Sequence, residues 1–332
     1  MPRPKKRPNR YSIIVFIIGI FIFVEILIIF PRTLEKAEED TPLEQAPTAN
    51  QFINQNGKSS IEQKMLGVHL VENGLEQKAW ELFAQEANGS ADANWTVKKL
   101  KVHFFSSAKS QFTVEGDIGE VDGESKNMMI RGQVTTTSSN GYLFKTHSLK
   151  YLSEEKLMIS PDPVSMKGPP DQQGKGFELT GNRLRVDLVK DKMEILEKIA
   201  AHKTMNGKSF SLTSDRASFS NKNQEAIFAG NVDMKLGDDQ VRAPIAYFIY
   251  SKTLKSFDKI ILKQGVRLTS LDKQATCQEL EISLFENKMT LRGQPKVQQG
   301  EDEIQGEEIV FLDGGKKVKI NRVSIKGKNI EK

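Results

Sequence analysis

The chain has 332 residues, of which 38% are hydrophobic and 27% are charged, and its pI is ≈ 9.0. The positive excess lies in residues 1–10, which hold five cations and no acid, whereas residues 11–332 balance 43 basic against 43 acidic residues. A chain that is neutral beyond its tail has no general attraction for phosphates, so nucleic acid is excluded as a partner. Cys277 is the only cysteine, which excludes an intramolecular disulfide.

Residues 11–30 form an apolar run that is broken only by Ser12, Gly19 and Glu25. A helix over this run spans about 30 Å, the thickness of the hydrocarbon layer. The basic tail before it (1–10) predicts a cytoplasmic N-terminus and an exported remainder. A cleaved signal peptide fits less well, because the run is too long and no A-x-A cleavage site follows it. Glu25 indicates either a partner helix in the membrane or a side chain that snorkels to the headgroups.

Residues 31–60 are rich in Pro, Glu, Gln, Asn and Ser without an apolar period, and they predict a linker. The next apolar segment, Lys78–Ala87, is ambiguous. Trp80 and Phe83 suit one face of a helix, but Trp80 and Leu82 also suit one face of a strand. We favour a strand, because strand-like segments follow it.

From Trp95 onward apolar and polar residues alternate, as in Leu184, Val186 and Leu188, which are separated by charged residues. Period two with one charged face is typical of half-buried antiparallel strands. Six turns recur at spacings of 36, 31, 31, 34 and 28 residues, and they begin at Glu154, Lys190, Asn221, Lys252, Glu286 and Gly314. Such a repeat predicts stacked units that share one core.

The predicted fold is therefore all-β, an open twisted β-jelly roll or a stack of antiparallel hairpins with about three strands per unit of the repeat. Turn residues separate the strands, and the spacing is too short for helical crossovers. The Pro-rich segment 160–176 is expected to be a loop that interrupts the stack, and a second seam of the stack is expected at residues 205–208.

No catalytic or metal-binding pattern is present in the sequence. The four histidines are far apart, no nucleophile elbow, P-loop or dinucleotide motif occurs, and the paired acids fall in turns. We therefore predict no enzyme activity, no cofactor and no metal. The apolar face is the remaining functional surface, and it is either a filled core or a groove for lipid. Strand parity predicts its inward residues as Leu149, Tyr151, Leu184, Val186, Leu188, Phe219, Phe228, Tyr247, Ile249, Leu280, Ile282 and Leu284.

The order of tail, helix, linker and β units resembles the LptC family of the bacterial lipopolysaccharide exporter. The segments that carry the resemblance are GVHLVENGLEQKAWELFAQEA, NWTVKKLKVHFF and LTGNRLRVDLVKDKMEILEKIAAH. The remainder, including FAGNVDMKLGDDQVRAPIAYFIY and MTLRGQPKVQQGEDEIQGEEIVFL, is similar to the OstA/LptA repeat of the periplasmic bridge. LptC-like proteins usually end near Ala201. The chain thus looks like an LptC-type module (61–206) fused to a bridge-type module (207–327).

The resemblance implies a periplasmic jelly roll that carries the acyl chains of lipopolysaccharide and is anchored in the inner membrane. It also implies that the helix packs beside the permease of an ABC transporter, whose ATPase supplies the energy. The last strand, Val318–Ile325, is then expected to add a strand from a periplasmic bridge or an outer-membrane assembly protein. Lys319 and Arg322 fit the alternative of a blunted edge. A structural scaffold with a filled core and an envelope enzyme on a β-solenoid are the competing interpretations.

Overall fold

The computed structural model describes residues 63–73, 78–89, 94–105, 111–139, 141–168, 178–205, 208–220, 223–251, 256–271, 273–283, 286, 288–313, 317–322 and 324–326. Every regular element in these ranges is a β-strand, and none of the described segments forms a helix that could cross a membrane. The predicted tail (1–10), membrane helix (11–30) and linker (31–60) lie outside the described residues.

Twenty-one strands form one sheet. Their bounds are β1 Gln63–Asn73, β2 Lys78–Gly89, β3 Trp95–Phe105, β4 Gln111–Val121, β5 Met128–Ser138, β6 Leu143–Leu152, β7 Leu157–Lys167, β8 Glu178–Asp187, β9 Lys192–Met205, β10 Lys208–Ser214, β11 Arg216–Ser220, β12 Glu225–Leu236, β13 Asp239–Ser251, β14 Ser256–Thr269, β15 Lys273–Ser283, β16 Lys288–Arg292, β17 Lys296–Gln299, β18 Asp302–Gln305, β19 Glu308–Leu312, β20 Lys317–Asn321 and β21 Ser324–Lys326.

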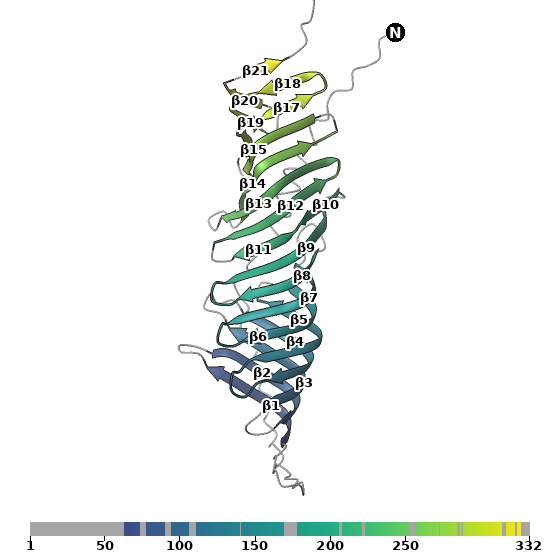
Figure 1. Cartoon of the computed structure of the whole chain (residues 1–332), viewed down its shortest axis with the longest axis vertical. Helices are drawn as coiled ribbons and strands as arrows, with labels where there is room; N and C mark the ends of the chain where they lie inside the picture. Colours follow the sequence, from purple (N-terminus) through teal and green to yellow (C-terminus); the bar gives the residue numbers. More distant parts are fainter. Residues whose placement is uncertain are drawn as a thin grey trace, which may run out of the picture.

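As far as β15 the strands follow one another in the sheet in the order of the sequence, whereas β16 and β17 both pair with β15 and continue to β19 and β18; all pairings are antiparallel. Each strand from β1 to β9 pairs with the next, and β12 to β15 continue in the same way. Between them, the short strands β10 and β11 together bridge β9 and β12. The C-terminal strands β16 to β21 are also short and complete the stack (Figure 1).

The long strands from β4 to β9 and from β12 to β15 have a bend near their middle, where the pairing register shifts. The shift falls between Arg131 and Val134 in β5, between Ala229 and Val232 in β12, and between Lys263 and Val266 in β14. Some rungs of the stack, by which we mean its successive levels, consist of two short strands instead of one long bent strand. There the gap between the two strands takes the place of the register shift, as at Asp215 between β10 and β11. Extra residues of this kind are β-bulges, which bend and twist a sheet. A line of bends therefore divides the sheet into two arms.

Glycine is required at several of these bends. Gly230 has a φ of +79°, and a Cβ atom there would collide with the carboxylate of Asp215 on the preceding rung. The same relation, with a spacing of fifteen residues, recurs where Asp117 lies over Gly132 and Gln278 lies over Gly293. A side chain at these glycines would meet both a left-handed backbone and an occupied space.

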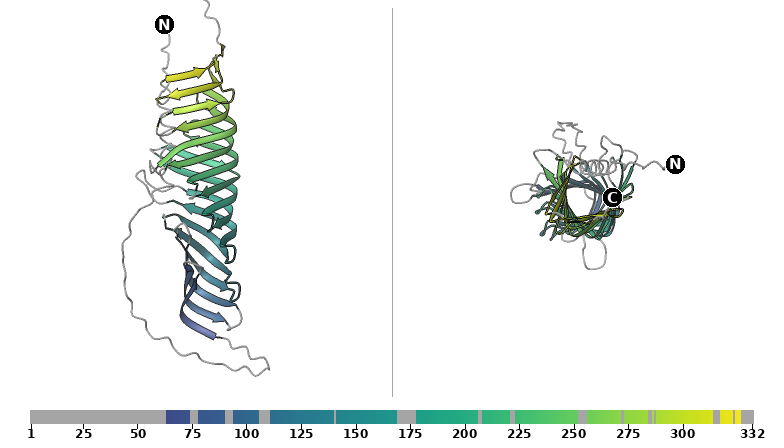
Figure 2. Two further views of the ribbon diagram at one scale, coloured as in Figure 1. Left: turned by 90° about the vertical axis from the view of Figure 1, so that its left-hand side faces the viewer. Right: turned by 90° about the horizontal axis from the view of Figure 1, so that it is seen from above.

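We call arm 1 the part of the sheet that ends at the turns 122–127, 153–156 and 188–191, and arm 2 the part that ends at turns such as 237–238. Figure 2 shows that the sheet curls about the long axis, so that the arms face each other. The predicted turns that the structure describes belong to arm 1, and consecutive turns on this edge are two strands apart. The predicted repeat is thus confirmed as a stack, but its unit holds two bent strands rather than about three.

The bend changes which residues face inward. In β13 the buried residues are Val241 and Ala243 before the bend, and Ala246 and Phe248 after it. In β12 the parity is the same on both sides, with Phe228 buried before the bend and later buried positions at even numbers. Between the same two cross-strand pairs β12 takes four residue steps, from Phe228 to Val232, whereas β13 takes three, from Ala243 to Ala246. Because side chains alternate with a period of two, the odd number of steps reverses the faces of β13.

Two further expectations are corrected by the fold, and one is confirmed. Lys78–Gly89 is a strand, as expected. The Pro-rich segment is not wholly a loop, because β7 continues to Lys167. Its prolines are tolerated at the bend, where the register shifts between Ser160 and Pro163. The predicted last strand is broken at Arg322, whose φ is +51°, so that β20 pairs with β19 and β21 with β18.

Candidate functional site

The inward face of arm 1 carries unbroken columns of apolar side chains. One column is fixed by direct register: Tyr151 pairs with Met158, Met158 with Val186, and Val186 with Met193. A second column runs from Leu184 through Ile195, Ala217, Phe228, Ala246, Leu262, Leu280 and Leu291 to Ile309. Cross-strand neighbours of this kind lie about 5 Å apart, so each column forms a continuous apolar track.

Nine of the twelve predicted residues lie on this inward surface. Eight of them are buried, with 6% of the side chain or less exposed: Leu149, Tyr151, Leu184, Val186, Leu188, Phe228, Leu280 and Ile282. The ninth, Phe219, is half-buried, packs against the core and forms an edge contact with Phe228 at 6.0 Å between ring centres. The register brings these residues into the same columns, although they are spread over more than 130 positions of the sequence.

The other three predicted residues are not placed on this surface, two because they face outward and one because it is not described. Tyr247 and Ile249 are half-buried and alternate with the buried Ala246 and Phe248, so they face the outside of arm 1. The reason is the bend of β13, which reverses the parity before these residues. Leu284 lies outside the described residues.

Further inward residues lie on both arms and were not predicted from the sequence. On arm 1 they include Phe248, Ile260 and Leu262, which are 0% exposed. On arm 2 they form another column: Val102, Val114, Leu179, Leu212, Met234 and Val241. The signal that locates the bend is a Gly followed by Asn or Gln in the sequence, as at Gly230 and Asn231, both of which have positive φ. In β13 no such pair marks the bend, which reads Arg242-Ala243-Pro244-Ile245, so this signal would not have located Phe248.

The two arms touch through aromatic rings in the N-terminal half. Phe104 on β3 pairs with Phe112, which precedes the bend of β4, and it therefore belongs to arm 2. Tyr151 pairs with Met128, which is in register with Val121 after that bend, and it belongs to arm 1. The two rings are 4.7 Å apart between centres. This contact closes the space between the arms at this level.

Buried polar atoms without a partner lie on the same residues and their neighbours. The indole Nε1 of Trp80 and the hydroxyl of Tyr151 make no hydrogen bond, and these side chains are 3% and 0% exposed. Burial raises the pKa of Tyr151 to about 12. The side chain of Ser153 partly offsets this rise from close to the phenol, although it does not reach hydrogen-bond distance and angle. An unsatisfied buried donor costs about 1–3 kcal/mol, so most such groups in proteins have partners.

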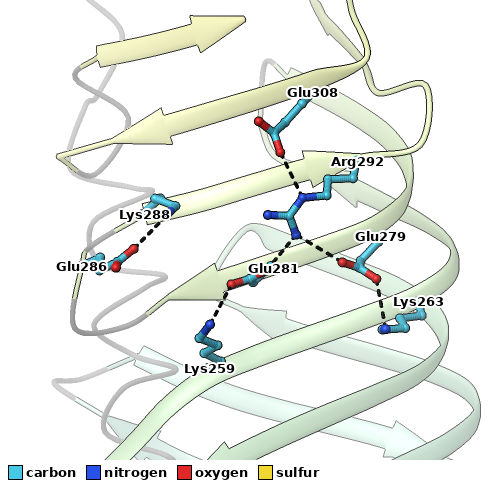
Figure 3. A network of polar contacts seen from close by, with 8 residues as sticks. All are labelled: Lys259, Lys263, Glu279, Glu281, Glu286, Lys288, Arg292 and Glu308. Atoms are coloured by element: carbon cyan, nitrogen blue, oxygen red, sulfur yellow. Dashed lines mark hydrogen bonds and ion pairs between the residues drawn. The ribbon is translucent and has the colours of Figure 1, made fainter. Parts of the chain in front are cut away.

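The outer face of the C-terminal strands carries a network of paired charges. Arg292 on β16 donates to carboxylates of both neighbouring strands at 2.8–3.3 Å, namely Glu279, Glu281 and Glu308 (Figure 3). Two lysines of β14 extend the network by ion pairs, Lys259 to Glu281 at 3.3 Å and Lys263 to Glu279 at 3.1 Å. Within this network three cations contact three carboxylates, so their formal charges cancel.

Nothing in the described ranges assembles a metal centre, because no group of three His, Cys, Asp or Glu side chains converges there. Two histidines, His69 and His103, contact the ring of Phe83 on the outside of β1 to β3. His202 lies 3.1 Å from Glu178. These pairs are separate from the apolar interior.

Comparison with protein families gives two matches along the chain. A model described as lipopolysaccharide-assembly, LptC-related, matches residues 40–205, which is half of the sequence. The chain belongs to the LptC-related family. A second model, the LptA/LptD N-terminal domain of lipopolysaccharide transport proteins, matches residues 211–313. An LptC-related part followed by an LptA-like part identifies a component of the lipopolysaccharide transport bridge, and both families consist of transport proteins, not enzymes.

A solved structure also resembles this LptC-related protein in part. It is LptH of Pseudomonas aeruginosa, described as the LptA-homologous periplasmic component of the lipopolysaccharide transport device. The match has 16% identity and a TM-score of 0.33, and it covers 36% of this chain and 95% of LptH. No curated protein sequence matches the chain.

Proposed function

We propose that this protein is anchored in the inner membrane by residues 11–30 and carries lipopolysaccharide through the periplasm along its apolar interior. The cargo comes from an ABC transporter whose permease the helix contacts. It leaves at the C-terminal end, where β20 or β21 pairs with a strand of a periplasmic bridge or outer-membrane assembly protein. The LptC-type module (61–206) and the bridge-type module (207–327) act as one conduit.

The observation that carries the proposal is the continuity of the inward columns across the join of the two modules. β9 ends the first module and β10 begins the second, and seven residues of β10 pair with β9, from Lys208 with Met205 to Ser214 with Ile199. β11 pairs with the other end of β9. The apolar track therefore passes the join without a gap.

The free energy of burying acyl chains suits such a track. Each methylene removed from water contributes about 0.8 kcal/mol, so a twelve-carbon chain gains roughly 10 kcal/mol in a dry groove. Successive rungs are similar and offer similar binding energies, so an acyl chain can move along the interior without being held at one strongly binding position. The arms lie together in this structure, so cargo entry requires them to separate.

A photo-crosslinking residue in the full-length chain tests the proposal. We expect a crosslinker at Phe248 to capture lipopolysaccharide only when the transporter hydrolyses ATP. The same group at Tyr247, one residue away on the outer face, is the control and should capture none. Capture at Tyr247 alone, or at neither position, contradicts the proposal.

A structural scaffold is the second candidate, and one observation favours it. Inward side chains such as Val97, Val102 and Val114 are 0% exposed, as in a filled core. A scaffold would bind protein partners at its edge strands and would capture no lipid at Phe248.

A further inference from the structure

The contact between the two arms differs from the rest of the interior, because it combines aromatic closure with unpartnered hydrogen-bond donors. Trp80 and Phe104 are neighbours in register on arm 2, and Phe104 meets Tyr151 of arm 1. Only three buried side-chain nitrogen or oxygen atoms lack a partner among the described residues, and two of them are Trp80 Nε1 and Tyr151 Oη. The third, on Thr290, lies in the C-terminal strands.

A carboxylate determines what kind of acceptor these donors suit. Glu72 on β1 pairs with Trp80 and acts on Tyr151 through its negative charge, which raises the pKa of the phenol. A second anion at this place would be repelled by Glu72, because like charges interact strongly in a poorly solvated site. A neutral acceptor, such as a carbonyl oxygen, suffers no such repulsion.

We propose that Trp80, Phe104 and Tyr151 form a subsite that holds the carbonyl group of an ester- or amide-linked acyl chain, with the cargo lipopolysaccharide as its source. This assignment rests on the proposed function. The rings of Phe104 and Tyr151 part to admit the chain, its methylenes lie on the apolar columns, and its carbonyl accepts hydrogen bonds from the indole N–H and the phenol O–H. The subsite thereby fixes the position of the carbonyl end of an acyl chain. The apolar columns alone do not fix this position, because they bind any part of the chain.

Removing one hydroxyl tests the subsite with little change in shape. In the full-length protein, Trp95→Phe leaves Trp80 as the only tryptophan, whose fluorescence reports on binding. In this background we expect Tyr151→Phe to bind lipopolysaccharide about tenfold more weakly, which corresponds to about 1.4 kcal/mol. Tyr247→Phe removes a hydroxyl from the outer face and should leave the affinity unchanged.

A pair of neutral detergents isolates the carbonyl. Sucrose monododecanoate has an ester carbonyl, whereas the dodecyl ether of sucrose has the same chain without one. We expect Tyr151→Phe to weaken binding of the ester and to leave binding of the ether unchanged. An equal effect on both detergents, or on neither, overturns the subsite.

The source of the acyl chain is tested with phosphatidylglycerol vesicles. If Tyr151→Phe lowers the affinity for lipopolysaccharide, the subsite binds the cargo. If Tyr151→Phe lowers only the affinity for phosphatidylglycerol, the assignment to the cargo is overturned. The crosslink at Phe248 keeps the two proposals apart. If it persists while Tyr151→Phe has no effect, the subsite fails and the conduit stands; if it is absent, the conduit itself fails.

Discussion

Tyr247 and Phe248 are adjacent in the sequence and lie on opposite faces of the same strand, Phe248 with 0% of its side chain exposed and Tyr247 half-buried on the outside. Phe248 contacts Phe228 of the neighbouring strand with 5.4 Å between ring centres. One of these neighbouring residues faces the interior of the folded sheet and the other faces its outer surface. They are therefore matched probes of the two faces.

Truncation of each residue to alanine should therefore have very different effects on stability. We expect Phe248→Ala to lower the free energy of unfolding by about 3–5 kcal/mol, because it leaves a cavity in the interior. Tyr247→Ala should cost about 1 kcal/mol or less, since its ring is only half-buried. Urea unfolding followed by circular dichroism measures both, and equal losses would mean that the faces are assigned wrongly.

A glycine at the bend should be hard to replace. Gly230→Ala should destabilise the protein by about 2–4 kcal/mol, because the methyl group meets both a left-handed backbone and the Asp215 carboxylate. Gly265 has a φ of +96° and open space where a Cβ atom would lie, so Gly265→Ala carries only the backbone cost of about 1–2 kcal/mol.

The double variant Gly230→Ala with Asp215→Ala separates the two causes. It should recover part of the loss by removing the collision, although the hydrogen bond from Asn231 to Asp215 is lost with it. Thermal unfolding of the parent, Gly230→Ala, Asp215→Ala and the double variant gives the comparison. No recovery in the double variant would show that backbone strain is the whole effect.

The network around Arg292 should make stability depend on pH in a defined direction. The pKa of Glu281 lies below its ordinary value of 4.5, first because Arg292 donates a hydrogen bond to it. A carboxylate with a lowered folded-state pKa stabilises the fold above its unfolded-state pKa and loses that contribution as the pH falls through the folded-state value. Arg292→Met should thus cost about 1 kcal/mol at pH 7, and the difference should shrink in acid below the pKa of Glu281.

Lys288→Met is the control for this effect, because Lys288 pairs with the exposed Glu286 at the end of β16. Screening by water leaves such a pair with little effect on stability. Denaturant titrations of both variants at pH 7 and at pH 3 measure how the loss in free energy of unfolding changes with pH. A constant difference between Arg292→Met and the parent at both pH values would contradict the role of Glu281.

Cys277 should be nearly inert to thiol reagents in the folded protein. It is 7% exposed, and burial raises its pKa to about 12, so almost no thiolate is present at pH 8. We expect roughly a thousandfold slower reaction with Ellman's reagent than in denaturant, because the thiolate is the reactive form. Tyr247→Cys adds an outward thiol that should react at once. Rapid labelling of Cys277 in the parent would show that the arms open often.

The sequence predicted the class of fold and most of the inward surface, because one apolar face and recurring turns are local signals. Leu184, Val186 and Leu188 could be assigned, since they follow a bend and precede a turn without a further irregularity. Tyr247 and Ile249 could not, because Pro244 and Ile245 lie where β13 reverses its faces, and both faces of the segment are apolar.

Contacts between the arms could not be predicted from the sequence. Phe104 and Tyr151 are 47 positions apart and meet only because the sheet curls about its axis. The missing partners of Trp80 and Tyr151 are likewise a property of the folded interior. A local pattern such as alternation carries no information about which strands face each other across a bend.

The unit of two bent strands has a consequence for size. Neighbouring strands are about 4.8 Å apart, so each added repeat of about 31 residues lengthens the molecule by roughly 10 Å. Because a repeat contains an even number of strands, the new end presents an edge of the same direction as the old one. A longer or shorter chain of this design would therefore span a different distance while offering the same terminal strand to its neighbour.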